Sequence, residues 1–168
     1  VMALKGIMAV WEDTPALMQQ TTILSQQIFP KLVPELMLKV REVSGGVRRI
    51  AWECLSTVAN LAKTGETQNL VFTLLATGLA GSSRYMKSAA VETLGKVLFV
   101  QRESVTKELR DRCIQTLLIL IEDQDRVVFK AVLRFSKIVV TLLTAEELEQ
   151  VAPLIFKGFE SKHINSVK

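Results

Sequence analysis

The apolar positions of three segments of this chain repeat in the same order. The segments begin at Val47, Met86 and Val127, so their starts are 39 and 41 residues apart. In each segment an alanine follows four places later, a leucine or phenylalanine eight places later, and a valine or isoleucine eleven places later. This spacing places the four residues on one face of an α-helix. The aligned positions are Ala51, Ala90 and Ala131, then Leu55, Leu94 and Phe135, then Val58, Val97 and Ile138.

A period near 40 residues, with room for two helices in each unit, is typical of an α-solenoid of the HEAT type. The alanine within each stripe allows a neighbouring helix to approach closely. The alternation of apolar and polar residues that marks β-strands is absent from the sequence. We therefore predict an all-α fold, a HEAT-type α-solenoid of about four stacked helix pairs wound as a right-handed superhelix.

Turn signals divide the chain into units, and we interpret residues 1–168 as a single fragment of a HEAT-repeat array. The expected units are residues 1–29, 30–64, 65–103 and 104–143, followed by a partial unit at 144–168. We expect helices over residues 2–11, 31–43, 47–63, 67–80, 84–100, 104–121 and 126–143, and a last helix after Thr144. Residues 16–29 are left without an assigned shape. Gly158 and Ser161 indicate another turn close to the end, so we expect a piece cut from a longer array.

Several residues predict how individual helices begin and end. Gly45, Gly46 and Gly81 are interpreted as residues at helix C-termini that adopt positive φ. Thr144 followed by Glu147 predicts a capping box. Prolines are tolerated in the first turn of a helix, where we place Pro34, and Pro153 well inside the last helix predicts a kink.

The mean hydropathy of +0.29 is high, which raises the question of a membrane span. The longest uncharged stretches, residues 14–30 and 67–83, have 17 residues each and contain several polar side chains. A spanning helix needs about 20 predominantly apolar residues. Helices buried on two sides explain the composition better, so we expect no membrane contact and no secretory leader. Cys54 and Cys113 fall in apolar helical patterns and are expected to be small buried side chains in a reducing compartment.

The sequence offers no recognisable catalytic or metal-binding motif. His163 is the only histidine, and with two distant cysteines it does not give the ligand spacing of a zinc site. Gly81-Ser82-Ser83 lacks the flanking glycines of a serine nucleophile elbow. We therefore expect a protein that is not an enzyme, binds no cofactor or metal, and has no small-molecule substrate.

Six basic residues stand near the N-terminal ends of the predicted second helices of the units. These ends stack in a solenoid, so the six side chains are expected to line one edge, here called the basic ridge. In one interpretation the ridge is an inter-unit ladder, paired with acids of adjacent turns such as Glu42, Asp123 and Asp125, because unpaired positive charge at a helix N-terminus is unfavourable. In the other it is a track for RNA phosphates or for an acidic partner. The basic ridge consists of Arg48, Arg49, Arg84, Lys87, Arg126 and Lys130.

The net charge of +4, from 21 basic and 17 acidic residues, is a weak field for nucleic acid. It favours the ladder, and any RNA contact of this fragment is expected to be weak. A second basic set, Lys96, Arg134 and Lys137, lies further along the helices and is expected to be solvated.

Residues 125–152 resemble the ribosomal RNA processing protein twelve family. The resemblance is carried by Lys130-Ala131 and Phe135-Ser136-Lys137, followed by an acidic and apolar helix. Arg134 stands where that family often has glycine, and residues 161–168 are poorer in arginine than its usual continuation. The resemblance implies a large eukaryotic solenoid of the nucleolus and nucleus that assists maturation and export of small-subunit pre-ribosomes. Its expected partners are proteins, either pre-ribosome assembly factors or transport factors.

Two other classes of function fit the same pattern. One is a nuclear transport receptor or adaptor, which is also a curved solenoid. The other is a general protein-interaction scaffold with no link to RNA. The predicted function is a non-enzymatic scaffold in ribosomal RNA processing, with these two as alternatives.

Overall fold

The computed structural model describes Gly6, Val10 and residues 23–62, 64–81 and 83–165. This part of the chain is all-α, as predicted, and contains no β-strand. The expected helix over residues 2–11 and most of residues 16–29 lie outside the described residues. The described elements are the π-helical turn η1 (Leu24–Ile28), the helices α4 (Phe29–Lys39), α5 (Gly45–Leu61) and α6 (Gly65–Ala76), the 3-10 turn η2 (Thr77–Leu79), and the helices α7 (Arg84–Gln101), α8 (Lys107–Ile121), α9 (Arg126–Leu142) and α10 (Ala145–Asn165).

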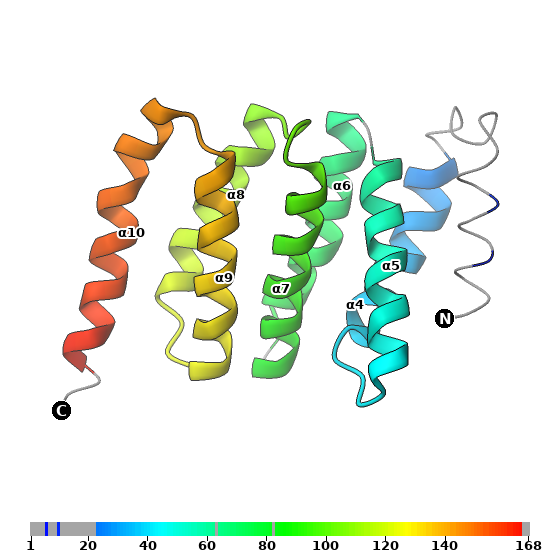
Figure 1. The fold of residues 1–168 in the computed structure, drawn as a ribbon, viewed down its shortest axis with the longest axis horizontal. Coiled ribbons are helices and arrows are strands. Elements are labelled where there is room, and N and C mark those ends of the chain that lie inside the picture. Colours follow the sequence, from blue (N-terminus) through cyan, green and yellow to red (C-terminus); the bar gives the residue numbers. More distant parts are fainter. Residues whose placement is uncertain (1–5, 7–9, 11–22, 63, 82, 166–168) are drawn as a thin grey trace.

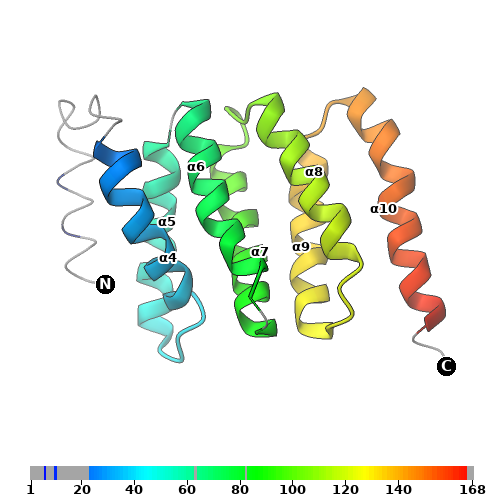
Figure 2. The ribbon, with the colours of Figure 1, turned by 180° about the vertical axis from the view of Figure 1, so that it is seen from behind.

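The helices form two layers of neighbouring antiparallel pairs. Figure 1 shows α5, α7 and α9 side by side in the nearer layer, and Figure 2 shows α4, α6 and α8 from behind. The helix α7 packs against both α5 and α9, whereas α10 packs against α8 and so continues the other layer. None of the described helices combines the length and apolarity that crossing a membrane requires.

The repeated apolar positions lie in the core between these layers, as predicted. Ala51, Ala90 and Ala131 are buried, and so are the residues four places later in each segment. Ala90 marks a close approach between elements: a Cβ atom added at Gly78 would lie 2.9 Å from the Cβ of Ala90. The small side chains therefore set how near η2 comes to α7.

Side chains cap the N-termini of α5, α6, α8 and α9, and the cap of α5 corrects one prediction. Ser44 caps α5 by accepting a hydrogen bond from the Val47 amide, so Gly45 and Gly46 form the first turn of α5 instead of ending α4. Neither they nor Gly81 adopts positive φ. The expected C-terminal role was wrong because the Ser44 hydroxyl satisfies an amide group at the start of the next helix.

The helix α4 also differs from its expected bounds. It begins at Phe29, directly after the π-helical turn, and ends at Lys39. Pro30 therefore occupies the first turn, where a missing amide hydrogen costs nothing. Pro34 lies two residues further inside the helix than predicted, beyond its first turn.

The turn expected near Gly158 and Ser161 is replaced by continuous helix, because α10 runs from Ala145 to Asn165. Gly158 faces α8, where an added Cβ would collide with the Ile121 side chain. This glycine is therefore a site of close helix packing.

The capping box predicted at the start of α10 is confirmed. The Thr144 amide donates to Glu147 Oε2 at 2.9 Å, and the Glu147 amide donates to Thr144 Oγ1 at 3.3 Å. Arg110 on α8 also donates to the Glu147 carboxylate, with Nε 3.2 Å from Oε2. One carboxylate therefore caps α10 and ties it to α8, in a pair whose side chains are 19% and 18% exposed.

We predict that Ala90→Phe destabilises the protein by about 1–3 kcal/mol, because the phenylalanine ring is too large for the space between Ala90 and Gly78. Urea unfolding followed by circular dichroism measures the change. Ala145→Phe is the matched control, since Ala145 is exposed on a helix. Equal midpoints for the parent and Ala90→Phe would contradict the burial of this position.

We also predict an acid-dependent effect of Glu147→Gln. The hydrogen bond from the Thr144 backbone, together with Arg110, lowers the pKa of Glu147 from its ordinary 4.5. A carboxylate whose pKa is lower in the folded than in the unfolded state stabilises the folded state. This stabilisation is complete above the unfolded-state pKa and disappears as the pH falls through the folded-state pKa. Glu147→Gln should therefore cost about 1 kcal/mol at neutral pH and progressively less below pH 4.5.

Urea unfolding at neutral and acid pH tests this dependence. Glu149→Gln is the control, because Glu149 is exposed on the same helix. A difference between Glu147→Gln and the parent that stays constant across the acid range would contradict the role given to ionised Glu147.

Candidate binding groove and basic ridge

The basic ridge lies at the N-terminal ends of α5, α7 and α9, which meet along the lower edge of Figure 1. Two of its members make contacts between units. Lys87 Nζ lies 3.1 Å from Asp123 Oδ2, and an Arg84 nitrogen lies 3.8 Å from Asp125 Oδ2. These acids belong to the turn between α8 and α9 and are the partners that the ladder interpretation named. Asp125 also caps α9, since its Oδ1 accepts from the Val127 amide at 2.7 Å.

The ridge arginines on α5 make contacts within one unit. Arg48 Nη1 donates to the carbonyl oxygens of Glu42 and Val43, both at 2.7 Å, and so satisfies groups just beyond the end of α4. Arg49 pairs with Glu53 one turn along the same helix. The Glu42 carboxylate pairs with Lys39 instead of a ridge residue.

The ridge residues on α9 are different again. Arg126 and Lys130 are exposed, and neither forms an ion pair within the described part of the chain. The basic ridge therefore forms ion pairs between units at α7 and contacts within one unit at α5. At α9 its positive charges have no ion-pair partner among the described residues. Its binding to RNA or to an acidic partner stays a prediction.

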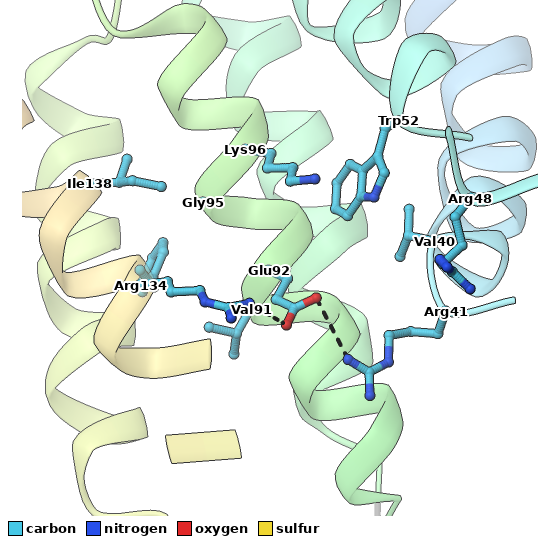
Figure 3. Close-up of a pocket in the computed structure, with 11 residues that line it drawn as sticks. Val40, Arg41, Arg48, Trp52, Val91, Glu92, Gly95, Lys96, Arg134 and Ile138 are labelled. Atoms are coloured by element: carbon cyan, nitrogen blue, oxygen red, sulfur yellow. Dashed lines mark hydrogen bonds and ion pairs between the residues drawn. The ribbon is translucent and has the colours of Figure 1, made fainter. Parts of the chain in front are cut away.

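A groove of about 620 Å³ lies beside the ridge, across α5, α7 and α9. We call it the basic groove. Its floor is apolar and its rim is charged, and Figure 3 shows the lining side chains around an open centre. The basic groove is lined by Val40, Arg41, Arg48, Trp52, Val91, Glu92, Gly95, Lys96, Arg134, Phe135 and Ile138.

Glu92 on α7 contacts two of the three arginines that line the groove. Arg41 Nη1 lies 3.7 Å from Glu92 Oε2, and Arg134 Nη1 lies 3.4 Å from Glu92 Oε1. Figure 3 shows the two guanidinium groups on opposite sides of this carboxylate. Each contact is single and long, so most guanidinium N–H groups remain available to another acceptor.

Lys96 and Trp52 form the other side of the groove. The Lys96 ammonium lies 3.5 Å from the centroid of the Trp52 ring, in a cation–π contact between α7 and α5. Burial lowers the pKa of Lys96, Glu92 opposes the shift, and the positive charge of Arg134 adds to it.

The second basic set is exposed to solvent, as expected. Lys96 and Arg134 also have a partner each on a neighbouring helix. Lys137 is exposed, as expected. The signal available in the sequence was the position of Glu92, which stands two residues after Ala90 in the repeat, where the other segments have Glu53 and Leu133.

The two cysteines are free thiols, and both are buried as expected. Burial raises the pKa of Cys113 to about 12, which leaves it protonated and unreactive at neutral pH. No group of three or more His, Cys, Asp and Glu side chains in the described residues is arranged to hold a metal ion.

These features define a class: an all-helical protein of successive packed pairs, with a charged groove across one layer. No protein-family model matches the chain. The chain is similar to a protein of Schizosaccharomyces pombe named "Putative ribosomal RNA-processing protein 12", with 26% identity over 132 residues. The match covers 74% of this chain and 11% of that relative, so the chain spans about a ninth of the relative's length. The predicted family resemblance is confirmed as a distant relationship.

We predict that Lys87→Gln destabilises the protein by at most about 1 kcal/mol, because it breaks a partly exposed ion pair between units. Lys130→Gln removes the same charge from an exposed residue and should leave urea unfolding unchanged. Added salt should narrow the difference between the two variants. The ladder would be contradicted if Lys87→Gln were as stable as Lys130→Gln while both lost affinity for RNA.

Proposed function

We propose that this chain is a stretch of a HEAT-type α-solenoid, with right-handed superhelical winding, that acts as a non-enzymatic scaffold in ribosomal RNA processing. The process that we propose is the maturation and export of small-subunit pre-ribosomes, in the nucleolus and nucleus. The observation that carries the proposal is the similarity to a ribosomal RNA-processing protein over 74% of this chain. Because the chain corresponds to 11% of that relative, the activity of the whole protein is part of the proposal.

The packing supports a scaffold role. Successive helix pairs bury their apolar faces against each other and leave one layer open along its length, where the basic groove and basic ridge lie. Stacked units with a continuous side surface are suited to binding other macromolecules. We propose protein partners, either assembly factors or transport factors, for this surface.

The basic groove favours a second candidate, a nuclear transport receptor or adaptor. Such a protein would hold cargo on the layer formed by α5, α7 and α9, where the groove crosses three helices. A general interaction scaffold unrelated to RNA would use the same surface, so the choice between these classes needs an experiment in cells.

The test is to deplete cells of the whole protein that contains this chain and to measure pre-ribosomal RNA by hybridisation. We expect precursors of the small-subunit RNA to accumulate, and a tagged copy to sediment with small-subunit precursors. Re-expression of the intact protein should restore processing, which is the control for indirect effects. Normal processing together with mislocalised nuclear proteins would contradict this function and favour the transport alternative.

A further inference from the structure

The basic groove has an excess of positive charge that its own side chains leave unmatched. Four cationic side chains line it, and Glu92 is the single carboxylate among the lining residues. Arg48 uses one terminal nitrogen for two carbonyl groups, while Arg41 and Arg134 each reach Glu92 through one long contact. The groove therefore presents guanidinium donors toward solvent, and these match carboxylates through paired hydrogen bonds.

The floor between the charges is apolar. Ile138 on α9 and Trp52 on α5 are partly exposed there, whereas Val91 on α7 is fully buried. Figure 3 shows Lys96 between Ile138 and the Trp52 ring. A ligand that fills the groove must therefore combine negative groups with at least one apolar group.

We propose that the basic groove binds an extended, acidic peptide segment of a protein partner, with carboxylates beside Arg41 and Arg134 and an apolar side chain against the partly exposed Ile138. This proposal deepens the scaffold function and rests on it for the biological setting. It names the chemistry of the partner and the residues that recognise it.

RNA fits the groove less well than an acidic peptide. Nucleic-acid sites on single strands stack bases on open aromatic faces, and the Lys96 ammonium covers one face of Trp52 at 3.5 Å. Phe135, the other aromatic residue in the lining, is 1% exposed. The neighbouring ridge is also interrupted, because Asp123 and Asp125 neutralise Lys87 and Arg84.

Because of Glu92, the proposal makes opposite predictions for acidic and basic ligands. The carboxylate occupies the position between the arginines and repels an incoming carboxylate, while it would attract a basic ligand. Glu92→Gln should therefore strengthen binding of an acidic peptide by about threefold or more, because Arg41 and Arg134 are released to the ligand. A substitution that only disturbed the structure would weaken binding.

The experiment is fluorescence anisotropy at physiological ionic strength with the purified chain. The probe is a fluorescein-labelled peptide that alternates leucine with aspartate and glutamate, and the comparison ligands are the same peptide with lysine in place of the acids and a labelled single-stranded oligouridine. Arg41→Gln with Arg134→Gln should weaken binding of the acidic peptide about tenfold or more. Lys107→Gln with Lys137→Gln, which removes equal charge from exposed residues outside the groove and the basic ridge, should change it less than about twofold.

Trp52 supplies a second readout that does not depend on charge. In a Trp11→Phe background it is the remaining tryptophan of the chain, so its emission should change when the acidic peptide covers the groove. Absence of binding by the parent, equal losses in the two double variants, weaker binding by Glu92→Gln, or tighter binding of oligouridine or the basic peptide would each overturn the proposal. Because this test uses purified chain, its failure leaves the pre-ribosomal RNA test in cells unaffected.

Discussion

The close approach of α7 to its neighbours is the constraint on which the described structure depends. A helix pair of this size cannot bury its apolar face alone, so each face is covered by the adjacent pair. On one side of α7, Ala90 lies against Gly78, where an added Cβ would be 2.9 Å away. On another side, a Cβ at Gly95 would lie 3.0 Å from the Ile138 side chain of α9. Small residues at these points allow the helices to pack as closely as in other protein interiors. Larger side chains would force the helices apart.

Polar contacts between units recur at nearly the offset that separates the apolar segments. Lys87 pairs with Asp123, 36 residues later. The Gln101 side chain donates to the Ala59 carbonyl, 42 residues earlier, inside the core. A buried amide donor without a partner would cost a large desolvation free energy. These contacts therefore favour one register between neighbouring pairs, in addition to the apolar contacts that hold the pairs together.

The all-α class could be predicted from the sequence because helical periodicity depends on residues close together in the chain and the same pattern occurs three times. Three copies of one stripe predicted the buried positions Ala51, Ala90 and Ala131 without knowledge of how the helices cross. Individual glycines were harder, because their role depends on what faces them. Gly158 resembled a turn residue, and only the position of Ile121 on α8 shows that it is a packing contact. The sequence prediction placed Gly45 at the end of α4. The Ser44 side chain instead caps the following helix, so Gly45 lies in the first turn of α5.

The basic groove could not be predicted in the same way, because it depends on the rotation of three helices about their own axes. Sequence periodicity places Glu92 on the side of α7 away from the core, but it does not state which neighbours reach it. In the structure the carboxylate meets Arg41 from the α4–α5 loop and Arg134 from α9. Exposed ion pairs contribute little to stability, and the Arg134 side chain is 74% exposed. The Arg134–Glu92 pair therefore adds little to the free energy of unfolding, so replacing Arg134 tests the proposed recognition of an acidic peptide with little loss of stability.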